Sequence, residues 1–205
     1  MPKPENKPII AVDVDDVLAV HAQEFVNYSN RKWGTNLEVG DYHDHWAEIW
    51  QVDWDETQRR LREYLEAGQF ASYKTVSDAD IALKKLKRNY RLAVLTARQK
   101  SLAEDTTTWL NKYFAEIFDE VHFAGVWDLG LEEAVKKNKT AVARQIGAKY
   151  LIEDQLKYAL PAAEAGIEVL LFGNYPWNKL SKLPPRVTRV KNWQEVLEYF
   201  DAAAW

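Results

Sequence analysis

The chain has 205 residues, a length that suits one domain with an insertion or two very small domains, and 47% of them are hydrophobic, as in globular proteins. The absence of cysteine excludes disulfide bonds and a thiol nucleophile. The formal net charge of -4 gives no electrostatic reason to expect a long nucleic acid as a partner.

The N-terminal stretch MPKPENKP is polar and rich in proline, unlike a secretory signal peptide. No apolar run approaches the roughly 20 residues that a membrane-spanning helix needs. We therefore expect a cytoplasmic protein with no membrane partner. The sequence gives no indication of an oligomeric state.

Apolar runs of strand length recur along the chain, at residues 9–13, 91–96, 120–124, 149–153 and 168–172. Several are almost continuously apolar, which is typical of strands buried on both faces of a parallel sheet. Helical patterns lie between them, at residues 78–88, 102–114, 139–147 and 155–165. The tail, residues 186–200, predicts a short edge strand and a closing helix. This alternation predicts an α/β fold with a doubly wound parallel sheet.

One segment interrupts the alternation after the first strand. It is long, aromatic and mostly helical in pattern, and it extends over roughly residues 20–76. We expect a small helical cap inserted into the main domain. The expected division is a core of residues 1–18 and 77–205 and a cap of residues 19–76.

Doubly wound sheets place their functional sites at the carboxyl ends of the strands. Polar groups gather there in this chain, although the strands themselves are apolar up to those points. They are Asp13, Asp15 and Asp16 after the first strand, Thr96, Ala97 and Arg98 after the second, and Glu153 and Asp154 after the fourth. Lys139 opens the helix that precedes the fourth strand.

These residue types predict phosphoryl chemistry. Asp13 and Asp15 are two residues apart, so in an extended chain they point to the same side. Crowding them with Asp154 would raise the pKa of each carboxyl by mutual repulsion unless a cation intervened. Mg²⁺ takes oxygen ligands and usually partners phosphate oxygens, to which Thr96 and Lys139 can donate. A carboxylate nucleophile can then form an aspartyl-phosphate that water hydrolyses.

The motifs DVDDVLA, LTAR, a lysine opening a helix, and LIED occur in this order. Together they are similar to the signature of the haloacid dehalogenase-like phosphatase superfamily, and the likeness extends over the whole chain. The resemblance implies that Asp13 is the nucleophile. It also implies that Asp15 is the general acid and base, with a backbone carbonyl that helps to hold Mg²⁺.

The same resemblance implies the remaining site residues. The implied phosphate-binding groups are Thr96, Ala97 and Lys139. The implied metal ligands are Asp13, Asp15 and Asp154. Non-catalytic versions of such a domain would normally lose the nucleophile or its partner, and this chain keeps both.

Three positions leave alternatives open. Lys136 and Lys137 lie close to Lys139, which we choose because it begins the helix and fits the expected spacing. Asp16 can cap the following helix, sit in a turn, or add charge to the site. Arg98 either contacts the substrate or pairs with a surface acid.

A narrower resemblance rests on DVDDVLA followed by a helical cap, GQF at residues 68–70, LTAR, LIED and a late NWQEV. These features resemble the bacterial 5'-nucleotidase and 5'(3')-deoxyribonucleotidase group, in which glycine usually stands in place of Asp16. The implied substrate is a small-molecule phosphomonoester, namely a nucleoside 5'-monophosphate. The alternatives are a phosphatase for another small phosphate and a non-catalytic phosphate-binding module.

The aromatic residues of the cap have two interpretations. Trp46, Trp50 and Trp54 recur every fourth residue, which predicts one helical face and a small aromatic cap core. Aromatic rings can also stack on a nucleobase, so Phe25 and Trp46 are candidates for lining the substrate pocket. The four histidines are interpreted as structural or substrate-lining.

Overall fold

The computed structural model describes residues 7–43, 45–125 and 139–202. Its strands are β1 (Ile9–Val12), β2 (Arg91–Thr96), β3 (Glu120–Phe123), β4 (Ala148–Glu153), β5 (Glu168–Phe172) and β6 (Val187–Val190). Within the described ranges they form one parallel sheet in the order β3-β2-β1-β4-β5-β6. All five predicted strands are confirmed, and β6 is the predicted edge strand.

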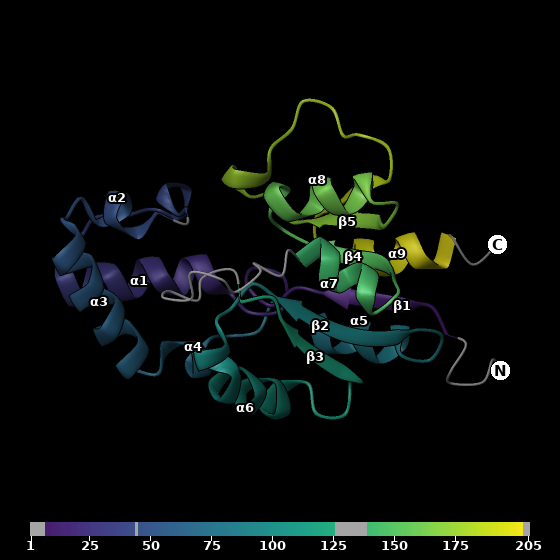
Figure 1. Ribbon diagram of the computed structural model, residues 1–205, viewed down its shortest axis with the longest axis horizontal. Coiled ribbons are helices and arrows are strands. Elements are labelled where there is room, and N and C mark those ends of the chain that lie inside the picture. Colours follow the sequence, from purple (N-terminus) through teal and green to yellow (C-terminus); the bar gives the residue numbers. More distant parts are fainter. Residues whose placement is uncertain (1–6, 44, 126–138, 203–205) are drawn as a thin grey trace.

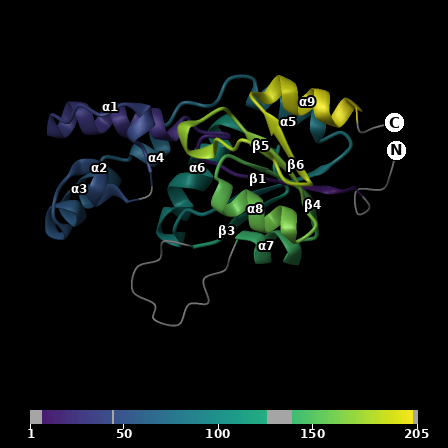
Figure 2. The ribbon, with the colours of Figure 1, turned by 90° about the horizontal axis from the view of Figure 1, so that it is seen from above.

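The helices are α1 (His21–Trp33), α2 (Trp46–Trp50), α3 (Trp54–Glu66), α4 (Gln69–Ser72), α5 (Ala79–Leu86), α6 (Ala103–Tyr113), α7 (Lys139–Gln145), α8 (Leu156–Glu164) and α9 (Trp193–Ala202). Short 3₁₀ turns occur at Val39–Asp41, Lys100–Leu102 and Pro176–Asn178. Helices α5 and α9 cover one face of the sheet and α7 and α8 the other, as Figure 2 shows. This confirms the doubly wound α/β fold. In the described ranges no helix has the length and apolar character needed to cross a membrane.

Two apolar layers explain why the central strands are almost continuously apolar. Side chains alternate across a strand, so Ile10 and Val12 of β1 pack in the layer beneath α5 and α9. Ala11 packs in the layer beneath α7 and α8. In β4, Ile152 and Leu151 divide between the layers in the same way. Both faces are therefore dry, and the strand ends are where polar side chains can reach water or a ligand.

The cap, which we define as the segment holding α1 to α4, lies between β1 and β2 and projects from one end of the sheet (Figure 1). The buried ring of Phe25 sits at its centre, with ring centroids 4.7 Å from Trp46, 5.4 Å from Trp50 and 5.7 Å from Tyr64. The predicted aromatic cap core is thus confirmed. Packed aromatic pairs contribute about 0.5–1.5 kcal/mol each beyond their burial, so this cluster holds the small cap together.

The prediction of one helical face for three cap tryptophans is wrong. Gln51 has a positive φ of 52° and ends α2, so Trp54 begins a new helix. The carboxylate of Asp53 caps that helix by accepting a hydrogen bond from the backbone N–H of Glu56 at 2.9 Å. Trp50 is 4% exposed, whereas Trp54 is 62% exposed.

The chain enters and leaves the cap at neighbouring points. Ala19 and Thr75 form an antiparallel β-bridge. The N–H of Val20 donates to the carbonyl of Lys74 at 2.9 Å, and the N–H of Val76 donates to the carbonyl of Leu18 at 2.7 Å. This junction lies just after the acidic residues that follow β1.

Candidate active site

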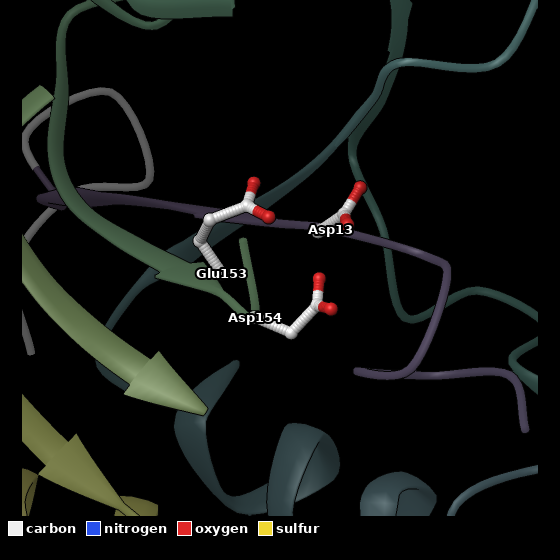
Figure 3. A group of neighbouring side chains, drawn as sticks. All are labelled: Asp13, Glu153 and Asp154. Carbon is white, nitrogen blue, oxygen red and sulfur yellow. The ribbon is translucent and has the colours of Figure 1, made fainter. Parts of the chain in front are cut away.

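The site lies where the sheet changes direction. The strand that follows β1 lies toward one edge of the sheet, and the strand that follows β4 lies toward the other edge. This divergence leaves a crevice at the carboxyl ends of β1 and β4. Asp13, Glu153 and Asp154 converge there (Figure 3). One carboxylate oxygen from each lies within 4.8 Å of the others, and all three residues are buried. As expected from the sequence, the carboxylates of Asp13 and Asp154 lie close together.

A buried lysine, Lys139, faces this group. The Nζ atom of the fully buried Lys139 lies 2.7 Å from Oδ1 of Asp13 and 2.5 Å from Oε2 of Glu153. Glu153 therefore binds the lysine of the third motif directly. Lys136 and Lys137, the alternative lysines, lie outside the described residues.

The three carboxylates carry more negative charge than Lys139 can neutralise. Burial, followed by the charge of Glu153, raises the pKa of Asp13 to about 7 despite the opposing effect of Lys139. Burial, followed by the charges of Glu153 and Asp13, raises the pKa of Asp154 well above its ordinary value. Carboxylate oxygens whose ionisation is opposed in this way suit a hard divalent cation, whose charge would offset the repulsion. The cluster therefore has the ligand chemistry of a divalent-metal site.

Asp15 has a different environment. Nε and Nη2 of Arg98 donate to its carboxylate at 3.0 and 2.6 Å, and Nδ1 of His21 lies 3.2 Å from it. Although burial opposes ionisation, Arg98 and His21 hold the pKa of Asp15 well below its ordinary value. At Asp15 the cation that offsets the expected repulsion is therefore the guanidinium of Arg98. Arg98, at 4% exposed, pairs with a site acid and not with a surface acid.

Asp16 connects the site to the cap. Its carboxylate accepts hydrogen bonds from the backbone N–H groups of His21 at 3.0 Å and Ala22 at 3.1 Å, so it caps the first turn of α1. Its φ of 58° lies in the left-handed region, which explains how glycine can serve at this position in related chains. Burial raises the pKa of Asp16 to about 6.

Only part of the second motif, LTAR, lies at the cavity. Thr96 is fully buried, and its Oγ1 accepts a hydrogen bond from the N–H of Arg98 at 3.2 Å. Ala97 and Arg98 line the cavity described next. In the described part of the chain, Thr96 and Lys139 are not among the residues that line it.

A cavity of about 390 Å³ lies between core and cap, above the acidic residues. Its lining from the core comprises Asp13, Asp15, Asp16, Ala97, Arg98, Gln99, Leu102, Asp154, Gln155, Lys157 and Tyr158. Its lining from the cap comprises His21, Tyr42, His45, Trp46, Ala47, Glu48, Trp54, Thr57, Gln58, Leu61, Leu65 and Phe70. One end of the cavity is therefore acidic and the other largely aromatic and apolar.

Of the two aromatic residues predicted to line the pocket, one lines the cavity and the other does not. Trp46 lines it, whereas Phe25 is buried in the cap core and is not among its lining residues in the described ranges. The expectation of Phe25 as a pocket residue is corrected accordingly. Sequence reasoning missed Trp54, because its spacing from Trp50 suggested a shared buried face.

Sequence reasoning also missed the loop that follows β5. Nε1 of Trp177 donates to Oδ2 of Asp154 at 2.7 Å, and the hydroxyl of Tyr175 donates to the carbonyl of Asp16 at 2.8 Å. A signal was available, because this loop leaves the carboxyl end of a strand, where doubly wound sheets place their sites.

Several solved structures share this fold. A haloacid dehalogenase-like family hydrolase from Streptococcus pneumoniae is 17% identical, with a TM-score of 0.69 and coverage of 95% of this chain and 98% of that one. A HAD-hydrolase from Bacillus subtilis, reported as bound to magnesium, is 15% identical, with a TM-score of 0.64 and coverage of 95% and 99%. Protein Tyrosine Kinase A from Mycobacterium tuberculosis is 18% identical, with a TM-score of 0.68 and coverage of 95% and 98%. These differing names at low identity indicate a common fold and not a common reaction.

The family comparison is more specific. Among curated protein sequences, none matches this chain significantly. The family model described as "5' nucleotidase, deoxy (Pyrimidine), cytosolic type C protein" matches residues 7–204, a stretch that includes the sheet, the cap and every acid of the site. The chain therefore belongs to this family of 5'-nucleotidases, which are hydrolases with the haloacid dehalogenase-like fold.

Proposed function

We propose that this protein hydrolyses nucleoside 5'-monophosphates in the cytoplasm, with Mg²⁺ as its cofactor. The observation that carries the proposal is a single cavity with a buried acidic cluster at one end and cap aromatics at the other. The acidic end suits a phosphoryl group with its cation, and the aromatic end suits a nucleobase. The family match supports the same substrate class.

The cation would bind to Asp13, Asp154 and the backbone carbonyl of Asp15. The fit rests on charge, because one lysine faces three buried carboxylates, and on the oxygen-only ligand set that Mg²⁺ prefers. When bound, the cation supplies neutralisation of the phosphoryl oxygens. Glu153 acts through Lys139, which it holds beside Asp13.

Asp13 is the proposed nucleophile. Its carboxylate oxygen attacks phosphorus, the bond to the 5'-oxygen breaks, and the product is an aspartyl-phosphate plus the nucleoside. Water then attacks the phosphorus and releases inorganic phosphate. Lys139 neutralises charge on the transferring group, and Thr96 and Ala97 help to hold it.

Asp15 is the proposed general acid and base. It gives a proton to the leaving 5'-oxygen in the first step and takes one from water in the second. Its pairing with Arg98 and His21 favours the ionised form, which is the form required for the second step. Donation in the first step therefore requires the carboxylate to separate from Arg98, and a bound phosphoryl group would compete for that guanidinium.

The cap end of the cavity supports a planar substrate group. The rings of Trp46, Trp54 and Phe70 line it, together with the polar side chains of Thr57 and Gln58. Stacking of a base on an aromatic ring is worth about 1–3 kcal/mol. A simple sugar phosphate would leave these rings uncovered.

The deciding experiment is a panel of phosphomonoesters, assayed with Mg²⁺ and with excess EDTA. We expect nucleoside 5'-monophosphates to give the highest kcat/KM and EDTA to abolish turnover. If nucleotides were no better than sugar phosphates or p-nitrophenyl phosphate, the substrate proposal would fail. Undiminished turnover in EDTA would overturn the proposed cofactor.

A further inference from the structure

The loop after β5 reaches the proposed metal site through Asp154. Nε1 of Trp177 donates to Oδ2 of Asp154 at 2.7 Å, and Nε2 of Gln155 donates to the same oxygen at 3.1 Å. Two donors on one oxygen restrict rotation of the carboxylate. Asp154 is almost fully buried, so the direction in which it presents its oxygens depends on these protein partners.

The loop itself is firmly held. The guanidinium of Arg189 donates to the carbonyl of Gly173 at 2.8 Å and to Oδ1 of Asn178 at 2.9 Å. The buried amide of Asn178 donates in turn to the carbonyl of Phe172 at 2.8 Å. A Cβ atom at Gly173 would lie 2.2 Å from the ring of Tyr175, so the close approach of that ring requires glycine.

Trp177 and Tyr175 form one stacked pair, with ring centroids 4.7 Å apart and planes inclined by 5°. The hydroxyl of Tyr175 donates to the carbonyl of Asp16 at 2.8 Å. The pair thus connects the acidic loop after β1 to the acidic residue after β4. On its cap side, Trp177 meets the edge of Tyr42 at 5.7 Å between ring centroids.

Other tryptophans show what a purely structural indole does in this fold. The buried Trp109 and Trp193 donate to the backbone carbonyls of Tyr73 and Val17. Trp33 donates to the carboxylate of Glu63 at 3.1 Å, but on the cap and outside the cavity lining. Trp177 differs because its N–H points at an acid of the catalytic cluster.

We propose that Trp177 is a positioning residue that fixes the Asp154 carboxylate in the orientation required for cation binding. The inference rests on the proposed metal site. Groups that hydrogen-bond to metal ligands commonly contribute 10- to 100-fold to metal affinity, because they orient the ligand before the metal arrives. Trp177 therefore acts through Asp154 and does not contact the cation.

The test is Mg²⁺ binding to the substrate-free protein, measured by isothermal titration calorimetry. Trp177→Phe keeps the stacked ring and removes the N–H donor, and we expect it to raise the Kd for Mg²⁺ by about tenfold or more. Trp33→Phe is the matched control, because it also removes an indole-to-carboxylate hydrogen bond. We expect its Kd to equal that of the parent protein.

Tyr175→Phe separates positioning from a general loosening of the loop. It keeps the stack and the indole donor while removing the bond to Asp16, so its Kd should stay close to the parent value. An unchanged Kd for Trp177→Phe would overturn the inference, as would an equal rise for Tyr175→Phe or Trp33→Phe. If the parent protein itself bound no Mg²⁺, the proposed metal site would fall as well, which distinguishes the two failures.

Discussion

Asp13 and Asp15 stand two residues apart, yet their carboxyl groups have pKa values that move in opposite directions. Asp13 shares Lys139 with Glu153, so burial and repulsion prevail there. Asp15 pairs with the Arg98 guanidinium and lies beside His21, and these interactions outweigh burial. Opposite pKa shifts in neighbouring acids are a recurrent way to separate a nucleophile from a proton-transfer group.

At Asp13, the proposed nucleophile, we expect substitution to abolish the reaction. Asp13→Asn replaces one oxygen by nitrogen at almost constant shape, so turnover should be abolished while the far-ultraviolet circular dichroism spectrum stays that of the parent. The measurement is phosphate release from the best substrate of the panel. Substantial turnover by the clean variant would show that no aspartyl-phosphate forms at this residue.

At Asp15, the expected consequence includes a loss of stability. Asp15→Asn leaves the buried Arg98 guanidinium without its counter-charge. Removing one partner of a fully buried pair costs about 3–5 kcal/mol, and partial exposure of Asp15 reduces this to roughly 2–3 kcal/mol. Urea unfolding at neutral pH measures the change. Equal or higher stability of the variant would mean that the pair contributes nothing to folding.

At the scale of single residues, the sequence indicated which residues gather at the strand ends. It did not indicate which side chains they pair with. Strand-end position was enough to nominate Asp13 and Asp154, because topology brings the ends of β1 and β4 together. Nothing local indicates that Asp15 pairs with Arg98, a residue 83 positions away. Trp177 was missed for the same reason, since its partner lies on another loop.

At the scale of elements, α3 contributes one of its sides to the cavity between core and cap. Trp54, Thr57, Gln58, Leu61 and Leu65 line the cavity from positions three or four residues apart, which is one side of a helix. The other side of α3 carries exposed ion pairs, such as that between Arg59 and Glu56. A helix with one face toward the ligand can change specificity without disturbing the core.

For this element, Trp54→Ala is the informative change. Trp54 is 62% exposed, so its removal should alter stability by no more than about 0.5 kcal/mol. Loss of one stacking ring should lower kcat/KM for nucleotides by roughly ten- to a hundredfold, with less effect on p-nitrophenyl phosphate. Comparison of kcat/KM for the two substrates is the measurement.

The control for this change is Ile81→Ala, which removes a half-exposed apolar side chain from α5, outside the cavity lining. It should leave both substrates unaffected. If Trp54→Ala also left nucleotide turnover at the parent level, the aromatic end of the cavity would not be the base site.

Element prediction was accurate in the core and weaker in the cap. Strands buried on both faces leave continuous apolar runs, which mark their bounds closely in the sequence. The break between α2 and α3 depends on Gln51 in a left-handed conformation, with neither glycine nor proline at the turn. A regular tryptophan spacing across that break therefore suggested one helix where there are two.

At the scale of the whole molecule, the raised pKa values in the acidic cluster make stability depend on pH. The folded protein keeps a proton on Asp13 up to a pKa of about 7, whereas the unfolded chain loses it near 3.8. This group therefore contributes stability that is complete below the lower value and is lost as pH rises through the higher one. The raised pKa of Asp154 acts in the same direction. The lowered pKa of Asp15 has the opposite effect on stability, but only at acidic pH below the ordinary aspartate range.

In EDTA, the free energy of unfolding should therefore decrease between about pH 5 and pH 8. Saturating Mg²⁺ should restore stability most strongly at the higher pH, because cations and protons compete for the same carboxylates. Urea unfolding at both pH values, with and without Mg²⁺, measures these differences. Stability that rises with pH in EDTA would contradict the repulsion described for the cluster.

The overall architecture was predictable because two independent patterns agree. Strand and helix alternate along the core, and the four motifs fall at the ends of the elements that meet at the switch between β1 and β4. The division of the chain at residues 18/19 and 76/77 stays a proposal. Which cap rings face the cavity was not predictable, since burial depends on how α2 and α3 pack and not on composition.

The bridge between Ala19 and Thr75 has an evolutionary consequence. The two ends of the cap segment are hydrogen-bonded neighbours, so another segment with equally close ends would leave the strand register undisturbed. Recombination could exchange this segment while the acids after β1 and β4 are inherited, at the loss of the contact between His21 and Asp15. One ancestral catalyst can in this way be adapted to a new metabolite without being rebuilt.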